Sequence, residues 1–512
     1  MGAAAFEGLP TMSFCIQTKP GRAGRLLLPI FGLAAALCAS TAMAAALSAT
    51  LPDSTAGKLG GELIRHINAD TAERIQLWAP SILSPAVAGG DKADFLKALA
   101  SAARDSGGVD LIEAHTQGPM LAVTIKARRT GQRAAFFLAP DPAQPGTLAV
   151  VALVPVDDPA LYAAWPKTAL PHAQIARLAH EALDAIVRSS DFSGCLTVSD
   201  GAATIFDECR GAAERSFGTP VNHQTRFHIG SMDKMFTAVA IAQLVDAGKL
   251  SWDSTLAQLV PEYPDHELAR KITVWQLLHH TAGLGDVFVP EFFANREKFV
   301  NPADYLDLIA RQPKVGAPGG DWNYSNAGYI LLGRIVEKAS GENYFDYIQR
   351  HVFVPAGMTA SGFDAQDEVM PQLATGYFHD GLFSTVWKAN AMTLPFKGSP
   401  AGGGYSTNAD LLRFAAALRD AKLVKPGTLQ KMFDNEVPAG PGGYAAGFGD
   451  RPSQGRHIRG HAGGADGMNA DLAIVWETGA TVAVTSNEGD SQAPMLLAEH
   501  VADLLAAQGA KP

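Results

Sequence analysis

Cysteine and positive charge are both scarce in this sequence, and each shortage excludes a class of protein. The 512 residues include only four cysteines, and no Cys/His cluster has the spacing of a metal site. We therefore expect no metal and no other cofactor. Lys and Arg number 41 against 51 Asp and Glu, which gives a net charge of −10, the wrong sign for a surface that binds nucleic-acid phosphates. The 18% of charged residues is too few for a disordered chain, and the 47% of hydrophobic residues is typical of a globular protein.

The first 44 residues have the pattern of a secretory signal peptide. Basic residues at positions 19, 22 and 25 precede an apolar run over residues 26–39, and Ala42-Met43-Ala44 supplies an A-x-A cleavage site. The run is shorter than the ~20 residues that span a bilayer, so we expect no stable membrane span. We predict a protein that is secreted or periplasmic; an uncleaved signal that anchors it to the membrane is the alternative. Either Met1 or Met12 can be the start.

Residues 45–157 have the pattern of a small α+β domain. Helical periodicity over residues 59–78 and 91–103 precedes four strand-like runs at 109–115, 120–128, 133–138 and 147–156. This order resembles a cystatin-like cone, and no cluster of catalytic residues lies in it. Residues 158–174 contain three prolines and form the predicted linker to a second domain over residues 175–510.

The second domain is predicted to contain one antiparallel sheet. A hairpin around Asp200-Gly201 comes near its start, strands at 472–476 and 481–486 come near its end, and a helix follows over 493–508. A long helical region with Gly/Pro-rich loops lies between them. We expect the first and last strands to be neighbours, with helices covering the faces of the sheet.

The predicted hairpin is flanked by Cys195 and Cys209, and an oxidising compartment would permit a disulfide between them. A two-residue turn at Asp200-Gly201 would place Cys195 opposite Phe206, three positions short of Cys209. The two cysteine side chains would then lie on opposite faces of the hairpin. We therefore favour free cysteines, and a disulfide would require a bulge.

A helix that is apolar nearly all round begins at Ser231-Met232-Asp233-Lys234 and ends near Gly248. Because residues i and i+3 share a face, the Ser231 hydroxyl and the Lys234 amine would lie side by side at the positive end of the helix. A buried lysine loses its proton more readily, since desolvation disfavours its charged form, and can then activate the serine. The alternative is a helix-capping serine followed by an exposed lysine.

A second motif, Tyr324-Ser325-Asn326, follows a Pro-Gly-Gly turn and precedes an apolar helix over 329–338. A tyrosine at such a junction can direct its hydroxyl into a cleft and relay a proton. The Asn326 amide can hold a substrate carbonyl or the lysine. The alternative is a buried tyrosine beside a capping serine.

A third motif, His461-Ala462-Gly463-Gly464, lies just ahead of the last strands. A glycine-rich edge strand lets a substrate approach the backbone and exposes an N–H group for an oxyanion. Other His-x-Gly sequences begin at residues 228 and 379, so only the order and the glycine-rich setting distinguish this one.

The order Ser-x-x-Lys, Tyr-x-Asn, His-x-Gly resembles the serine β-lactamase and penicillin-binding-protein superfamily, in particular its branch of class C β-lactamases, D-alanyl-D-alanine carboxypeptidases and family VIII esterases. The intervals of 93 residues from Ser231 to Tyr324 and 137 residues on to His461 fit that family. LLHHTAGL at 277–284 and GGGYSTNA at 402–409 are further matching sequences. The resemblance covers residues 175–510. It implies an α+β, β-lactamase/transpeptidase-like fold, with an antiparallel sheet flanked by helices plus a helical subdomain.

The resemblance also implies a serine hydrolase mechanism. Ser231 would be acylated, Lys234 and Tyr324 would share the general-base role, and Tyr324 would protonate the leaving group. Asn326 would order the site, and water would hydrolyse the acyl-enzyme. No G-x-S-x-G sequence occurs, which removes the main support for an α/β-hydrolase.

The third motif would supply the rest of the site. His461 would take the position that lysine holds in Lys-Thr-Gly members. The backbone N–H groups of Gly464 and Ser231 would hold the oxyanion, and Gly463 would border the substrate.

One departure from the family pattern concerns the substrate. Members that cleave D-Ala-D-Ala peptides or β-lactams bind the substrate carboxylate with hydroxyl residues, where this chain has Ala462 and Gly464. Asp466 would repel a carboxylate if it faced the pocket; Arg459, on the same strand face as His461, could compensate. We predict a small-molecule or peptide acyl substrate, with a preference for neutral esters or amides. A D-alanyl-D-alanine carboxypeptidase, a β-lactamase and a slowly deacylating penicillin-binding sensor are the alternatives, and the oligomeric state is left open.

Three other residues near these motifs receive structural interpretations. His279 and His280 end a predicted helix, where we expect them to cap or pack rather than bind a metal. Asp233 is expected to be a carboxylate in the first turn of its helix, beside the positive end of the helix dipole.

Overall fold

The computed structural model describes residues 50–87, 89–158, 160–190, 192–434, 436–440, 442–489 and 491–508. The predicted signal peptide at residues 1–44 lies outside these ranges and stays a prediction. Within the ranges, no helix combines the length and the apolar composition needed to cross a membrane.

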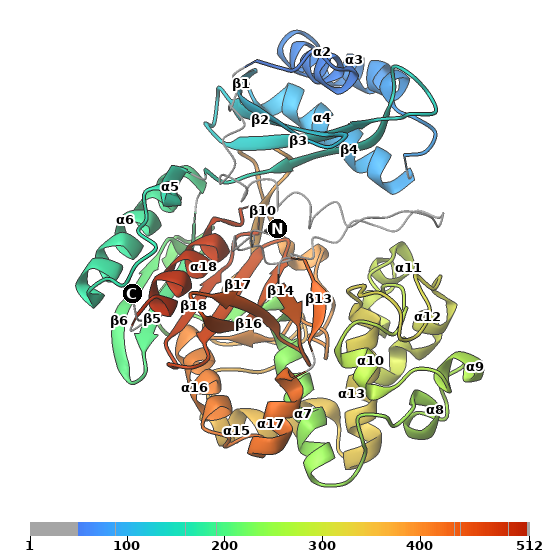
Figure 1. Ribbon diagram of the computed structural model, residues 1–512, viewed down its shortest axis with the longest axis vertical. Helices are drawn as coiled ribbons and strands as arrows, with labels where there is room; N and C mark the ends of the chain where they lie inside the picture. Colours follow the sequence, from blue (N-terminus) through green and yellow to red (C-terminus); the bar gives the residue numbers. More distant parts are fainter. Residues whose placement is uncertain are drawn as a thin grey trace, which may run out of the picture.

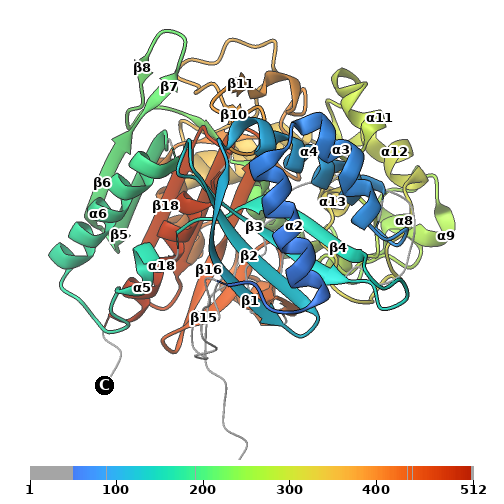
Figure 2. The ribbon, with the colours of Figure 1, turned by 90° about the horizontal axis from the view of Figure 1, so that it is seen from above.

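The first described part of the chain is a layer of helices on a four-stranded sheet (Figure 2). Its elements are α2 (Thr55–Ala69), α3 (Ala72–Trp78), α4 (Gly89–Asp105), β1 (Val109–Gln117), β2 (Met120–Ala127), β3 (Arg133–Pro140) and β4 (Leu148–Pro155). The strands pair antiparallel in chain order, and their core includes Leu63, Val123 and Phe136. The single helix predicted over 59–78 is two helices, because Asp70 and Thr71 are extended and Thr71 caps α3. The independence of this part as a domain stays a prediction.

The rest of the chain is organised around an eight-stranded sheet in the order β13-β14-β15-β16-β17-β18-β5-β6, with every neighbouring pair antiparallel. Its strands are β5 (Gly194–Asp200), β6 (Ala203–Arg210), β13 (Val437–Ala439), β14 (Gly442–Tyr444), β15 (Gly449–Ser453), β16 (Arg456–Ala465), β17 (Met468–Val475) and β18 (Thr481–Ser486). β18 lies beside β5. This confirms the prediction that strands from the two ends of this region are neighbours.

Helices cover both faces of the large sheet (Figure 1). Val475 and Val484 point to one face, where they pack with α6 and α18, and Leu472 and Ile474 point to the other face and the main core. This alternation follows from the two-residue period of a strand. The helices are α5 (Ala160–Ala163), α6 (His172–Ser190), α7 (Asp233–Asp246), α8 (Leu256–Leu259), α9 (His266–Ala269), α10 (Val274–Leu278), α11 (Pro290–Phe293), α12 (Leu306–Arg311), α13 (Asn326–Ser340), α14 (Tyr344–Ile348), α15 (Val354–Ala356), α16 (Asn408–Arg419), α17 (Pro426–Phe433) and α18 (Ala493–Ala506). The predicted helical subdomain corresponds to α8–α13, which lie together beside the sheet in Figure 1.

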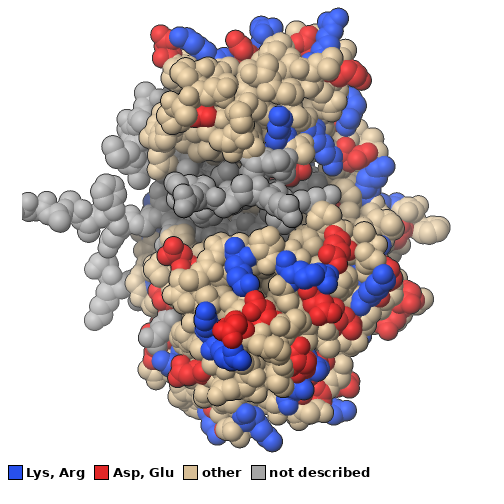
Figure 3. Space-filling view, turned by 90° about the vertical axis from the view of Figure 1, so that its right-hand side faces the viewer, with Lys and Arg blue, Asp and Glu red and all other residues tan. Residues whose placement is uncertain are grey.

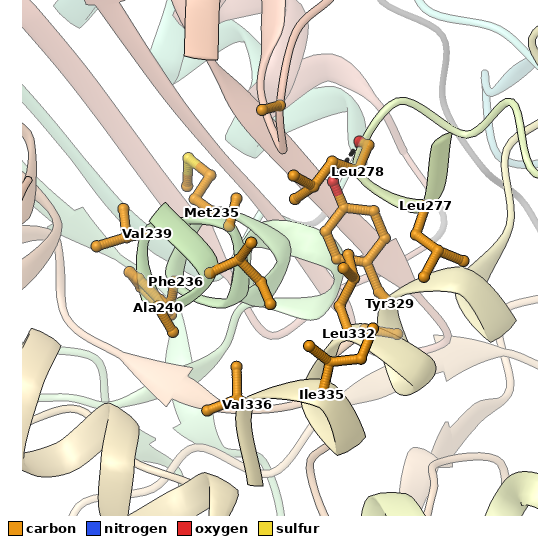
Figure 4. Close-up of a cluster of buried hydrophobic side chains, with 14 of the residues drawn as sticks. Met235, Phe236, Val239, Ala240, Leu277, Leu278, Tyr329, Leu332, Ile335 and Val336 are labelled. Atoms are coloured by element: carbon orange, nitrogen blue, oxygen red, sulfur yellow. Dashed lines mark hydrogen bonds between the residues drawn. The ribbon is translucent and has the colours of Figure 1, made fainter. Parts of the chain in front are cut away.

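Helix α7 is the centre of the main core, as its apolar surface predicted. Figure 4 shows Met235, Phe236 and Val239 of α7 in one apolar cluster with Leu332 and Val336 of α13. Each large apolar side chain buried in this way contributes about 1.5–3 kcal/mol. The burial holds the N-terminal end of α7 in place, and with it the Ser231 turn.

β16 is not an edge strand of the sheet as a whole, but its segment from His461 to Ala465 has a strand on one side only, as the expectation of an edge strand at His461 requires. Three short strands, β13–β15, lie beyond β16, but β15 pairs with β16 only as far as Gly460. From His461 to Ala465, β16 has β17 on one side and the turn that contains Ser231 on the other. The three short strands were not predicted because residues 437–453 contain prolines and glycines and no regular apolar alternation.

A disulfide joins Cys195 of β5 to Cys209 of β6, so the preference for free cysteines is also wrong. The turn lies one residue later than predicted, with Asp200 opposite Ala203, and a register shift follows between Val198 and Ser199. Together these two differences place Cys195 directly opposite Cys209.

A hairpin of the second region reaches into the core of the first. It is formed by β10 (Tyr377–His379) and β11 (Trp387–Ala389), and the loop between them places Phe383 in the core beneath α2–α4. Ser101 of α4 donates a hydrogen bond to the Leu382 carbonyl at 2.7 Å. Four further short strands are β7 (Ala212–Glu214), β8 (Thr219–Pro220), β9 (Phe227–His228) and β12 (Tyr405–Ser406). On the face seen in Figure 3, positive and negative side chains are interspersed.

Candidate active site

Ser231 lies in a short turn, Gly230–Met232, that leads into α7. Gly230 has φ +52°, and a Cβ there would lie 3.0 Å from the Gly464 amide nitrogen. A Cβ on Gly463 would lie 1.9 Å from the Ile229 carbonyl oxygen. Only glycine permits both features, so the glycines bring the backbone of β16 against the serine turn.

Lys234 is fully buried one helical turn after Ser231. Its Nζ lies 3.1 Å from the Ser231 Oγ and 2.9 Å from the Asn326 Oδ1, and it also donates to the Ala401 carbonyl. The alternative of an exposed lysine is wrong. The amide and carbonyl oxygens can only accept, so they take two N–H groups of the amine. The third position on Nζ faces the serine. It donates when the amine is protonated, and it can accept the serine proton when the amine is neutral.

Asn326 begins α13 and connects the lysine to a carboxyl group that sequence reasoning missed. Its Nδ2 donates to both carboxyl oxygens of Asp286, at 3.3 and 3.1 Å. Burial raises the pKa of Asp286, although Asn326 and two backbone N–H groups oppose that rise. Asp286 therefore sets the orientation of the Asn326 amide, so that its oxygen points to Lys234. The position two residues after LLHHTAGL was the signal that could have identified Asp286.

Tyr324 lies in the loop just before α13, where Ser325 caps the helix by accepting the Gly328 N–H at 3.2 Å. The Lys234 Nζ is 4.8 Å from the centre of the Tyr324 ring. The centre of the His461 ring is 6.3 Å from that of Tyr324. The three predicted motifs therefore meet around Lys234.

His461 is buried and neutral at ordinary pH. Burial, with a smaller contribution from the positive Lys234, lowers the pKa of His461 to about 3. Its Nδ1 lies 2.6 Å from the Ala462 carbonyl, so Nδ1 carries the proton, and Nε2 accepts a hydrogen bond from the Tyr444 hydroxyl at 3.0 Å. Tyr444, on β14, was missed because that strand was not predicted. A neutral imidazole cannot supply the positive charge that a lysine would supply at this position.

Arg459 does not take over that charge. Its Nε donates to the Asp450 Oδ2 at 2.7 Å, and its guanidinium lies 4.2 Å from the centre of the Phe433 ring. Asp466 is exposed in the turn after β16, and its carbonyl accepts a hydrogen bond from Asn390. Among the described residues, no group of three or more His, Cys, Asp or Glu side chains is placed to hold a metal ion.

A buried Ser-Lys pair joined to a tyrosine, an asparagine and a glycine-rich strand is the composition of a serine acyl-transfer site. The family model described as Beta-lactamase matches residues 181–507. The chain belongs to the beta-lactamase family, and the predicted β-lactamase/transpeptidase-like fold is confirmed.

Three relatives illustrate the range of this family. The chain is 31% identical over 259 residues to a putative penicillin-binding protein, PbpX, of Bacillus subtilis, which is 50% of this chain and 62% of PbpX. It is 28% identical over 214 residues to esterase EstB of Burkholderia gladioli, which is 39% of this chain and 55% of EstB. The crystal structure of a penicillin-binding protein from Bacillus halodurans aligns with a TM-score of 0.55 at 30% identity, over 64% of this chain and 98% of that one. The matches thus span less than two thirds of PbpX and of EstB.

Proposed function

We propose that the protein is an exported serine hydrolase that forms an acyl-enzyme on Ser231 and acts on neutral esters or amides. The observation that carries the proposal is the buried Lys234, whose Nζ lies 3.1 Å from the Ser231 Oγ while two acceptor oxygens occupy its other hydrogens. A lysine in this position can act as the base for the serine.

In the proposed reaction, the Ser231 Oγ attacks the acyl carbon and its proton passes to Lys234 or Tyr324. The carbonyl oxygen becomes an oxyanion, which the backbone N–H groups of Ser231 and Gly464 stabilise. The bond to the alcohol or amine then breaks, and the leaving group takes a proton from Tyr324. Water hydrolyses the acyl-enzyme, so that the products are an acid and the free leaving group.

The preference for neutral substrates rests on the described positions at which family members bind a substrate carboxylate, none of which supplies a free positive charge here. His461 is neutral, Arg459 is paired with Asp450, and the hydroxyl-bearing positions of other family members hold Ala462 and Gly464. The similarity to an esterase, EstB, supports the same preference.

A second function is favoured by the similarity to penicillin-binding proteins. Under it, the protein is a D-alanyl-D-alanine carboxypeptidase, a β-lactamase or a penicillin-binding sensor that deacylates slowly. The same serine would be acylated, but a substrate that carries a carboxylate would be preferred.

The test compares the purified protein with its Ser231→Ala variant on a short nitrophenyl ester, on nitrocefin and on a D-Ala-D-Ala peptide. We expect fast ester turnover, lost by a factor on the order of 10⁴ or more in the variant, and much slower turnover of the other two. A stoichiometric burst with nitrocefin and no ester turnover would establish the second function instead. Turnover that survives in the variant would refute both.

Export is supported by the pattern of residues 1–44 and by the Cys195–Cys209 disulfide, because disulfides persist in oxidising compartments. Fractionation of the producing cell should place the protein outside the cytoplasm, with Ala45 as its first residue. A cytoplasmic protein that retains residues 1–44 would contradict this part of the proposal.

A further inference from the structure

His280, expected only to cap or pack, lies directly against the loop of the proposed proton-relay tyrosine. It follows α10, two residues beyond Leu278. Its carbonyl oxygen accepts the Asn323 N–H at 2.8 Å, and its ring Nδ1 accepts the Ser325 N–H at 3.0 Å. One residue therefore holds the backbone on both sides of Tyr324.

The imidazole also packs on the tyrosine ring itself. The ring centres of His280 and Tyr324 are 4.3 Å apart, with an angle of 31° between the planes. The same imidazole is 4.6 Å from the ring of Tyr444, which donates to His461. His280 thus contacts Tyr324 and the residue that orients His461, and it is 1% exposed.

The hydrogen bonds of the imidazole exclude an acid–base role for it. Because Nδ1 accepts from Ser325, the proton of the neutral ring is on Nε2, which has no hydrogen-bond partner among the described residues. Burial, with the nearby Lys234, keeps the pKa of His280 well below its ordinary value. The ring therefore stays neutral and does not exchange protons with the substrate. Its contacts with Tyr324 therefore hold the tyrosine in place and do not transfer a proton.

The backbone conformation at position 280 makes it possible to remove the imidazole without changing the course of the backbone. His280 has φ +56°, a left-handed conformation that glycine and asparagine adopt more readily than histidine. The conformation alone does not require an imidazole. Glycine at position 280 would preserve the chain path and remove only the ring.

We propose that His280 is a positioning residue that holds the Tyr324 hydroxyl in place for proton transfer. The proposal rests on the proposed hydrolase function and names a residue outside the three motifs on which that site depends. It predicts that loss of the imidazole slows acylation of Ser231 and leaves substrate binding largely intact.

The experiment compares His280→Gly and His280→Asn with His279→Ala as a matched control. His279 is equally buried at the end of the same helix, but its Nδ1 bonds to the Trp275 carbonyl and its ring packs on Trp275. Each variant is mixed with excess nitrophenyl ester, and the rate of the first turnover, the KM and the melting temperature are measured.

We expect His280→Gly to slow the first turnover about 10- to 100-fold with a KM within about threefold of the parent protein. His280→Asn should recover part of the rate, because its side-chain oxygen can accept the Ser325 N–H and asparagine tolerates the left-handed backbone. His279→Ala should leave the rate within about threefold of the parent, whatever its melting temperature. In a Tyr324→Phe background, His280→Gly should cause little further loss. The proposal would be overturned if His279→Ala and His280→Gly lost the same rate. It would also be overturned if His280→Gly slowed the Tyr324→Phe variant by the same factor as it slows the parent protein.

A crystal structure of the His280→Gly variant gives a readout that does not depend on catalysis. We expect the loop at residues 323–325 to be displaced, and a Tyr324 unmoved from its position in the parent protein would refute the proposal. If the parent protein itself fails to react with any of the three substrates, the proposed function is wrong, and the crystal structure still decides the role of His280.

Discussion

Asp233 lies between Ser231 and Lys234 in sequence, but its carboxyl group forms its hydrogen bond with the segment that follows Ala401. Its Oδ2 accepts the Gly404 N–H at 2.6 Å, and its side chain is buried. Burial raises the pKa of Asp233 to about 8, against smaller opposing effects of Gly404 and Lys234. The expected first-turn position is confirmed, but the carboxyl is neutral at pH 7 and does not act as an anion on the helix dipole.

This pKa predicts a pH-dependent effect of Asp233→Asn on stability. An aspartate in the unfolded chain ionises near pH 3.9, whereas folded Asp233 keeps its proton up to about pH 8. The wild-type protein therefore loses stability as the pH rises from about 4 to 8, because the folded state binds the extra proton. Asparagine does not titrate. The melting temperature of Asp233→Asn should rise relative to the wild type over this range and level off above it.

The control for this prediction is Asp253→Asn, on the surface, measured at the same pH values. If the difference in melting temperature between Asp233→Asn and the wild type is the same at pH 5 and at pH 8, folded Asp233 is ionised over this range.

Residues within short motifs could be predicted from the sequence, and residues supplied by distant loops could not. Ser231 and Lys234 are three positions apart on one helix, so their proximity follows from helical geometry. Asp286 and Tyr444 reach the site from a loop and from a short unpredicted strand. Tyr444 has no local pattern that distinguishes it, and the signal for Asp286 was its position two residues after LLHHTAGL. His280 was visible in the sequence, but a histidine at a helix end more often packs than positions a catalytic residue.

At the scale of elements, the helices of the second region were easier to predict than its strands. Helix α7 has apolar residues on every side, which only a buried helix has. The pairing of β5 and β6 depends on a bulge, and one inserted residue reverses which side chains share a face. No local pattern in residues 195–209 indicates that bulge, so the disulfide could not be predicted.

The disulfide predicts a stability effect that is separate from activity. It closes a loop with a sequence separation of 14 residues, for which the cross-link should contribute roughly 3 kcal/mol. Cys195→Ala/Cys209→Ala should lower the free energy of unfolding in urea by about that amount. Because β17 and β18 lie between β16 and β5 in the sheet order, ester turnover should stay within about twofold of the parent.

The double variant also replaces two cysteine side chains with smaller ones. The wild-type protein with its disulfide reduced controls for this change in volume, and it should unfold at the same urea concentration as the double variant. A loss of less than about 1 kcal/mol would mean that the hairpin is held by its neighbours alone.

At the scale of the whole molecule, the hairpin β10–β11 joins the two regions. Phe383 is 3% exposed in the core beneath α2–α4, although it belongs to the second region. Asn390, just after the same hairpin, donates to the Asp466 carbonyl in the turn that ends β16. The first region, which contains α2–α4 and β1–β4, is therefore connected through this hairpin to the strand that carries Gly463 and Gly464.

Phe383→Ala should weaken this connection. Removal of a buried phenylalanine costs about 3–5 kcal/mol, and the loss should appear as a lower melting temperature and as faster proteolysis between residues 157 and 172. Val386→Ala in the same loop, where the side chain is 55% exposed, is the matched control and should change neither. Equal proteolysis of the two variants would show that the regions are held together by other contacts.

The pairing of β5 with β18 has a consequence for biosynthesis. Ser199 of β5 donates to the carbonyl of Thr481 on β18, 282 positions later, and contacts between such distant segments form late in folding. The groups around the Lys234 amine come from residues 231, 326 and 401, and β16, which carries the proposed oxyanion site, follows at 456–465. A chain still being synthesised can therefore contain Ser231 and Lys234 without the complete proposed site. We expect acyl transfer to begin only when the C-terminal strands have been made, so that a prematurely terminated chain has no acyl-transfer activity.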